Sequence, residues 1–321
     1  MGLIQKITDW FRRKETVIKR PPPPPVGPFP TLEVFSQAGH GKSSYLWAVL
    51  YMLRKMNMVW PDYLCWPEDE STDNSLKEIQ EKVAESRLPT RGVTENKHRY
   101  DLRLQNMERW GEKKLIVWDW PDPVFATDLD GDRPEKTNWL APAWWLISLP
   151  DLGEVRAEVL DMLFDDLMRK RIRQGFSVYR SPLRLIVVLT KGDAIPNLPL
   201  PLRQYLKDDP LWKAVSAEVS LLSPPDSSPP APLRLGEEPL RLYLGTLTRA
   251  HEVIRQWLES TLVGHMLIRR AAEYHVDLRF SIVSATGSGL VDGNGLQIPW
   301  TPRRVLDPLF WALELDSAAA R

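Results

Sequence analysis

The 321-residue sequence has a single cysteine and no surplus of charge of either sign. One cysteine excludes an intrachain disulfide and is typical of a reducing compartment, so we expect a cytoplasmic protein. Lys and Arg together number 42, as do Asp and Glu, which gives no electrostatic reason to expect a nucleic-acid partner. No apolar run reaches about 18 residues, so no transmembrane helix is predicted.

The first 30 residues combine a basic amphipathic stretch with a run of prolines. The apolar residues of MGLIQKITDWFRRK fall on one helical face, with lysines and arginines beside them. This pattern predicts a helix within residues 1–20 that packs on the domain or on a protein partner, or that lies on a membrane surface. RPPPPPVGPFP, residues 20–30, predicts an extended tether. We therefore expect a docking arm over 1–30 and a folded domain over 31–321.

Beyond the tether, apolar runs of strand length alternate with helical patterns. Strands are predicted at 31–36, 98–107, 114–120, 143–149, 183–193 and 277–287. Helices are predicted at 43–57, 74–88, 151–176, 247–274 and 303–315. The second and third strands should form an antiparallel hairpin, and the alternation elsewhere predicts an α/β fold. Its sheet should be mostly parallel, with helices on both faces.

FSQAGHGKSSYL, residues 35–46, has the pattern of a phosphate loop between a strand and a helix. Ser36 stands where the usual G-x-x-x-x-G-K-[ST] pattern has its first glycine. Backbone N–H groups of the loop would bind phosphate oxygens, Lys42 would reach the β- and γ-phosphates, and Ser43 would bind Mg²⁺. The predicted phosphate-binding residues are Ser36, Ala38, Gly39, His40, Gly41, Lys42, Ser43 and Ser44.

Three later loops also follow predicted strands. Asp119 in LIVWDWPDP can hold Mg²⁺ through water, or it can be an ordinary strand-end aspartate facing solvent. Asp193 in LTKGD can accept the N1–H and 2-amino hydrogens of guanine, and a backbone N–H in SATG can bind its O6. The predicted guanine-binding residues are Thr190, Lys191, Asp193, Ser284, Ala285 and Thr286. Simple turns remain the alternative for both loops.

The order of these pieces resembles a P-loop GTPase of the translation-factor-related (TRAFAC) class. Within it the chain is similar to bacterial double-GTPase (DO-GTPase) domains found in conflict-type gene neighbourhoods. The resemblance rests on GHGKSSYL, VWDWPDP, VVLTKGD, SATGSG and PRRVLDPLFWAL, and it spans about residues 31–315. It implies a P-loop GTPase-like sheet that binds GTP or GDP with Mg²⁺. It also implies a nucleotide-dependent switch within a bacterial multi-protein defence-type system.

The sequence departs from the pattern of this class at residues linked to hydrolysis. Asp122 replaces the glycine whose N–H meets the γ-phosphate, and no glutamine follows to orient a water molecule. Ser284 comes 91 positions after Asp193, which predicts an insertion at about 195–275. Nucleotide binding is therefore expected with slow GTP hydrolysis. The alternative is a binding or scaffold module that holds nucleotide without turnover.

PTRGVT, before the second predicted strand, offers the switch residues. Either Thr90 or Thr94 can bind Mg²⁺, and Thr94 is preferred because it lies closer to that strand. Arg91 lies three residues before Thr94, a spacing similar to that of the arginine of heterotrimeric G protein α subunits. That arginine stabilises charge on the transferring phosphoryl group. A solvated loop arginine is the alternative.

Overall fold

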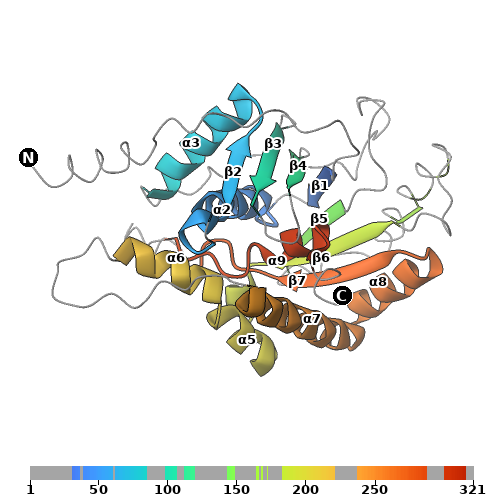
Figure 1. Cartoon of the computed structure of the whole chain (residues 1–321). Helices are drawn as coiled ribbons and strands as arrows, with labels where there is room; N and C mark the ends of the chain where they lie inside the picture. The colour runs from blue at the N-terminus through green and yellow to red at the C-terminus, as the bar shows by residue number, and fades with distance from the viewer. Residues whose placement is uncertain are drawn as a thin grey trace, which may run out of the picture.

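The structure is a computed structural model of the whole chain (Figure 1). It describes residues 31–36, 39–60, 62–84, 98–106, 112–119, 143–148, 183–220, 237–287 and 300–315, with Phe164, Asp165, Met168 and Ile172. The predicted docking arm at 1–30 and most of the predicted helix at 151–176 lie outside the described residues. None of the described helices has both the length and the hydropathy to span a membrane.

Within the described residues, seven strands form one sheet, and Figure 1 shows them running from β2 near the top to β7 near the bottom. In sheet order they are β2 (Leu64–Pro67), β3 (His98–Gln105), β4 (Lys113–Asp119), β1 (Thr31–Ser36), β5 (Ala143–Ser148), β6 (Arg184–Thr190) and β7 (Asp277–Ile282). The strands from β4 to β7 in this order pair in parallel, while β3 is antiparallel to both β2 and β4. The predicted hairpin and the mostly parallel α/β sheet are confirmed.

Strand β6 shows how helices come to cover both faces of the sheet. Its apolar run is buried from Leu185 onward, as expected of a parallel strand packed on two sides. Ile186 and Val188 pack in a core with helix α2 (Lys42–Lys55). Leu185, Val187 and Leu189 pack in a second core with helix α8 (Leu262–Glu273). Successive side chains of a strand point to opposite faces, so these two cores lie on opposite faces.

The remaining helices complete the layers around the sheet. They are α3 (Glu70–Ala84), α5 (Leu200–Lys207), α6 (Pro210–Ser220), α7 (Glu237–Glu259) and α9 (Asp307–Ala312), with short 3-10 helices at Met56–Met58 and Gly192–Ala194. Helices α5 to α8 all lie between β6 and β7 in the chain. They occupy the stretch where the sequence predicts an insertion.

The predicted helix at 247–274 is wrong in its bounds, because it is two helices in the structure. The first, α7, begins at Glu237, and the chain breaks between Glu259 and Leu262. The Thr261 hydroxyl accepts a hydrogen bond from Gly264 N (3.1 Å) and caps α8. A Cβ on Gly264 would lie 2.2 Å from Leu258 O, so the bend requires glycine there.

The predicted helix at 303–315 is shorter in the structure, and one strand was not predicted. Helix α9 covers only Asp307–Ala312 because Arg303 pairs with Ser284 as an isolated β-bridge. Strand β2, with helices α5 and α6, has no counterpart among the predicted elements. β2 is only four residues long and ends in proline, which leaves little alternation to detect.

Candidate nucleotide site

The predicted site residues that the structure describes come together at one edge of the sheet. Strands β1, β4, β6 and β7 belong to the parallel part of the sheet, so their carboxyl ends face the same way. These ends are Ser36, Asp119, Thr190 and Ile282. Ligands of parallel α/β sheets bind at this edge, outside the carboxyl ends of the strands.

The glycine loop connects β1 to α2. Ser36 is the last residue of β1 and lies in extended backbone, which accepts a Cβ, so serine can stand in place of the usual glycine. Gly39 and Gly41 have φ angles of 85° and 81°, in the left-handed region that favours glycine. Gly41 is the residue that precedes helix α2, and Lys42 is the first residue of that helix. The loop therefore presents the start of α2 toward the edge of the sheet.

Lys42 and Asp119 form a buried ion pair at the centre of this edge. Lys42 Nζ donates to Asp119 Oδ1 at 2.5 Å across 77 residues of sequence, and each residue is 4% exposed. Desolvation makes such a pair expensive, and removal of one partner leaves an uncompensated buried charge. Asp119 therefore does not face solvent as an ordinary strand-end aspartate would.

The turn after β6 lies against the glycine loop. Thr190 Oγ1 donates to the backbone oxygen of His40 at 2.6 Å, and both residues are buried. A Cβ built on Gly41 would lie 3.9 Å from Lys191 Cε, so the stem of Lys191 passes over this glycine. Two motifs 150 residues apart are thus joined by a direct contact.

Gly192 fixes the shape of this turn. A Cβ there would lie 2.8 Å from Leu206 Cδ1 and 2.9 Å from Ile282 Cγ1, closer than side chains approach. Its N–H donates to Val283 O at 2.9 Å, which ties the turn to the end of β7. With Gly192 buried, the flanking Lys191 and Asp193 are both exposed at the edge of the sheet.

Ser284 orients Asp193 through a short relay. Ser284 Oγ accepts from Gly287 N at 3.0 Å and donates its proton to Asp193 Oδ1. Two backbone hydrogen bonds with Arg303, of 2.7 and 3.1 Å, hold Ser284 in place. Ala285 and Thr286 follow, both half-buried. The predicted guanine-binding residues therefore form one connected group.

Lys191 adopts φ 54° and ψ 35°, a left-handed conformation that is strained for a residue with a Cβ. We expect Lys191→Gly to be more stable than Lys191→Ala by about 0.5–1 kcal/mol, because glycine relieves this strain. Urea unfolding without nucleotide measures the difference. The same pair of substitutions at Lys77, an exposed position in the middle of helix α3, should give the opposite order. Equal stability at position 191 would contradict the strain.

Several predicted site residues cannot be compared with the structure. Ala38, Thr90, Arg91, Thr94 and Asp122 lie outside the described residues. Ser43 and Ser44 are half-buried in the first turn of α2, where a hydroxyl can meet a bound ion.

Two residues that support the site, Gly287 and Arg303, were missed by the sequence analysis. Gly287 could have been found from the sequence, because a glycine three residues after Ser284 favours a turn, and its φ is 70°. Arg303 acts through its backbone, which carries no signal in the sequence.

The site fits Mg²⁺ only together with phosphate oxygens. In the part of the chain that the structure describes, no three His, Cys, Asp or Glu side chains gather as a metal site. Mg²⁺ is commonly held by one or two carboxylates and by substrate phosphates, with several waters kept. Asp119 and Ser43 would supply the protein's share of such a shell.

The chain matches no protein-family model and no curated protein sequence. Among solved structures it is similar to the signal recognition particle receptor SRb–GTP/SRX complex from Chaetomium thermophilum, with 13% identity and a TM-score of 0.36 over 86% of this chain and 97% of that chain. It is also similar to a chain described as nucleolar GTP-binding protein 1 from Plasmodium falciparum, with 11% identity and a TM-score of 0.33 over 93% of each chain. Neither similarity is high enough to carry a conclusion about function, which is therefore inferred from the geometry of the site.

Proposed function

We propose that this chain binds a guanine nucleotide with Mg²⁺ at the carboxyl edge of its sheet and acts as a nucleotide-dependent switch. The observation that carries the proposal is the contact between the Thr190–Asp193 turn and the glycine loop. Thr190 donates to His40 O, and Lys191 passes over Gly41. A base held at that turn would place its phosphates at the start of α2, where backbone N–H groups bind anions.

The Lys42–Asp119 pair supports a phosphate and metal site at the same place. Without nucleotide, each charge stabilises the other in a buried position. An entering nucleotide would supply phosphate oxygens for Lys42 and a hydrated Mg²⁺ for Asp119 and Ser43. Lys42 would then pair with phosphate oxygens and Asp119 with the hydrated Mg²⁺, so neither charge would be left without a partner. Binding would therefore separate Lys42 Nζ from Asp119 Oδ1.

Guanine suits the groups that face the base position. Asp193, oriented by Ser284, offers carboxylate oxygens that accept N1–H and the 2-amino hydrogens. Adenine has an acceptor at N1, which would face these oxygens without a proton between them. The Lys191 stem offers an apolar surface for one face of the ring, beside Gly41.

The switch and its partners are proposed from the sequence alone. GTP would order the segments that hold Thr94 and Asp122, and loss of the γ-phosphate would release them toward a protein partner. A carboxylate at Asp122 is repulsive beside a γ-phosphate, which favours slow hydrolysis or a module that holds nucleotide without turnover. The resemblance to DO-GTPase domains suggests a bacterial defence-type system as the setting. Residues 1–20 would dock this protein on that partner or on a membrane surface.

Replacement of Lys42 by alanine tests the phosphate site. We expect GTP affinity, measured by calorimetry with Mg²⁺, to fall at least about tenfold, because the cation nearest the β/γ-phosphates is lost. The free energy of unfolding without nucleotide should also fall, by about 3–5 kcal/mol, because the carboxylate of Asp119 stays buried without its cation. Affinity must therefore be measured below the unfolding temperature of the variant.

Two further variants separate binding from folding. Lys42→Arg keeps a cation beside Asp119 but presents a wider, planar group, so it should restore stability more than affinity. Lys55→Ala, at the other end of α2, should change neither property by much. If folded Lys42→Ala binds GTP as tightly as the wild-type protein, the phosphate site is wrong.

A further inference from the structure

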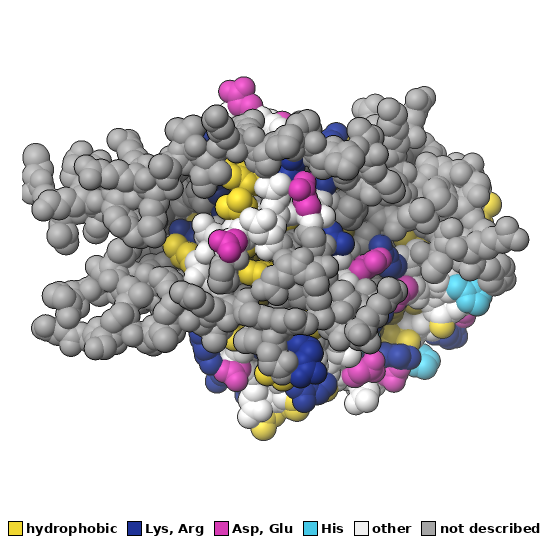
Figure 2. Space-filling view, viewed as in Figure 1, with side chains coloured by type: hydrophobic (Ala, Val, Ile, Leu, Met, Phe, Trp, Pro, Cys, Tyr) yellow, Lys and Arg dark blue, Asp and Glu magenta, His cyan; other side chains and the backbone are white. Residues whose placement is uncertain are grey.

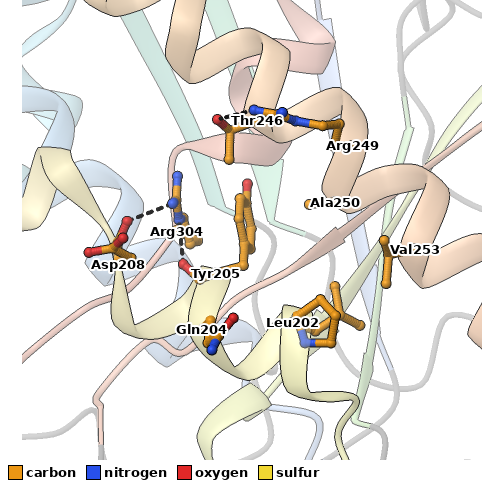
Figure 3. A pocket seen from close by; sticks show the side chains of 10 residues that line it. Leu202, Gln204, Tyr205, Asp208, Thr246, Arg249, Ala250, Val253 and Arg304 are labelled. Carbon is orange, nitrogen blue, oxygen red and sulfur yellow. Dashed lines mark hydrogen bonds between the residues drawn. The ribbon is translucent and has the colours of Figure 1, made fainter.

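A hollow of about 250 Å³ lies between α5 and α7, and none of its lining residues belongs to the candidate nucleotide site (Figure 3). Leu202 and Tyr205 line it from α5, and Thr246, Ala250 and Val253 line it from α7. The four α7 positions Thr246, Arg249, Ala250 and Val253 follow helical spacing, so they form one stripe along that helix. Drug-sized sites measure about 300–1,000 Å³, so this hollow suits a fragment-sized molecule.

The polar groups around the hollow that have few or no hydrogen-bond partners are mainly donors. Arg249 is exposed, and the one hydrogen bond assigned to its side chain is a long one to Thr246 Oγ1 (3.4 Å). Arg304 also lines the hollow and is only 3% exposed, and its Nη1 is buried without a hydrogen-bond partner. Figure 3 shows Arg249 above the hollow and Arg304 beside Tyr205. Figure 2 shows basic, acidic and hydrophobic side chains together on the lower part of the molecule, where Figure 1 places α5 and α7.

Arg304 is held rigidly and stays charged. Its Nε donates to Tyr205 O (2.9 Å), its Nη2 donates to Asp208 O (2.7 Å), and its guanidinium lies 3.8 Å from the centre of the Tyr205 ring. Burial alone would lower the pKa of Arg304, but Tyr243, Asp307 and other neighbouring acidic groups raise it above its ordinary value. The hollow therefore has a fixed, permanent cation in its wall.

The nearby carboxylates already accept hydrogen bonds from other groups. Asp208 pairs with Lys213, and Asp209 accepts from the backbone N–H groups of Leu211, Trp212 and Arg304. Asp307 accepts from the hydroxyls of Tyr205 and Tyr243. These carboxylates are thus already paired, whereas the Arg249 guanidinium has only one long hydrogen bond, which favours a ligand that brings an acceptor.

We propose that the hollow between α5 and α7 is a binding site for a small carboxylate with an apolar body. The carboxylate would accept from Arg249, in the charge-assisted geometry that guanidinium groups favour, and the fixed positive charge of Arg304 in the wall would stabilise it. The apolar body would lie between Leu202 on α5 and Ala250 and Val253 on α7. The residues that form this site are not those of the nucleotide site, and the proposal does not require that the chain binds GTP.

Three probes with the same six-carbon chain test the ligand class: hexanoate, hexanol and hexylamine. Binding to the full chain is followed by ligand-observed NMR titration. Hexanoate should bind at least about fivefold more tightly than hexanol, because only the carboxylate makes charge-assisted hydrogen bonds. Hexylamine should bind most weakly, because it brings a cation to two arginines.

Three variants locate the binding. Arg249→Ala should weaken hexanoate at least about threefold and leave hexanol nearly unchanged, since it removes a donor and keeps the apolar walls. Ala250→Leu should weaken both probes, because the larger side chain fills the hollow. Arg255→Ala removes an exposed cation that pairs with Glu259 on the same helix and should change neither. Thermal unfolding of each variant shows that it is folded.

Three outcomes would overturn the proposal. The first is equal affinity for hexanoate and hexanol, and the second is unchanged hexanoate binding in folded Ala250→Leu. The third is absence of saturable hexanoate binding up to about 10 mM, which is weaker than a fragment of this size should show in a formed site.

Discussion

Replacement of Asp193 by asparagine is expected to move the nucleotide preference from GTP toward XTP. In the wild-type protein the two carboxylate oxygens would accept N1–H and the 2-amino group of guanine. The Ser284 hydroxyl donates to Asp193 Oδ1, so it should hold the oxygen of the asparagine on its own side. The new amide NH₂ would then face the 2-amino group of guanine. Both groups are donors, so no hydrogen bond can form between them. Xanthine has a carbonyl at position 2, which this NH₂ can bind.

The expected size of this effect is large, because guanine would place a donor against the new donor while xanthine would form both hydrogen bonds. Discrimination of roughly 10²- to 10⁴-fold between the two nucleotides is expected. Competition of GTP, XTP and ATP against a labelled nucleotide measures it for both proteins. Asp277→Asn, at the first residue of β7 and so at the opposite edge of the sheet, is the matched control and should keep the wild-type order. Without a crossover between GTP and XTP, Asp193 is only a turn residue.

The second large effect concerns Asp307, which is fully buried beside two tyrosines and Arg304. Desolvation raises the pKa of Asp307 from 3.8 to about 7, against the opposing effects of Arg304 and the hydroxyls of Tyr205 and Tyr243. The folded chain therefore holds a proton here that the unfolded chain releases near pH 4. This contribution to stability is complete below pH 3.8 and is lost as the pH rises through about 7. A pKa difference of about three corresponds to about 4 kcal/mol in total.

His251 changes stability in the opposite direction over part of this range. Burial lowers the pKa of His251 to about 4, so its contribution grows as the pH rises from about 4 to 6.5. The wild-type curve alone therefore mixes the two groups. Comparison with Asp307→Asn isolates the carboxyl, because asparagine keeps the shape and does not titrate.

We expect the difference between Asp307→Asn and wild type in free energy of unfolding to shift by about 2–3 kcal/mol in favour of the variant between pH 5 and pH 8. Urea unfolding at several pH values measures this difference. Asp277→Asn, at a half-buried position where the carboxylate pairs with Arg279, should show no comparable shift. A constant difference between Asp307→Asn and wild type across this range would show that Asp307 is ionised in the folded protein throughout.

The strands and loops that form the candidate site could be predicted because their signals are local. Strand β6 is a run of buried aliphatic residues, and the turn after it carries Gly192 and Asp193 within three residues of its end. Both features depend on residues adjacent in sequence. The parallel arrangement of the strands then places their loops at one edge without further information.

Contacts between distant segments could not be predicted. The hydrogen bonds from Thr190 to His40 and from Ser284 to Asp193 depend on the register of strands across the sheet. No single stretch of sequence determines that register. The break before α8 is different, since Thr261 and Gly264 are ordinary capping residues whose spacing was overlooked. Arg303 contributes to the site only its backbone N–H and C=O groups, and any residue except proline could supply both.

The position of β1 in the sheet has a consequence for the order of folding during synthesis. β1 precedes the other described strands in the chain, yet it lies between β4 and β5. Strand β5 ends about 110 residues after β1, so a ribosome adding 5–20 residues per second leaves β1 without its second neighbour for roughly 5–20 seconds. During that interval its unpaired edge can join another nascent chain. A chaperone that shields this short apolar strand should raise the yield of folded protein more than one acting after release.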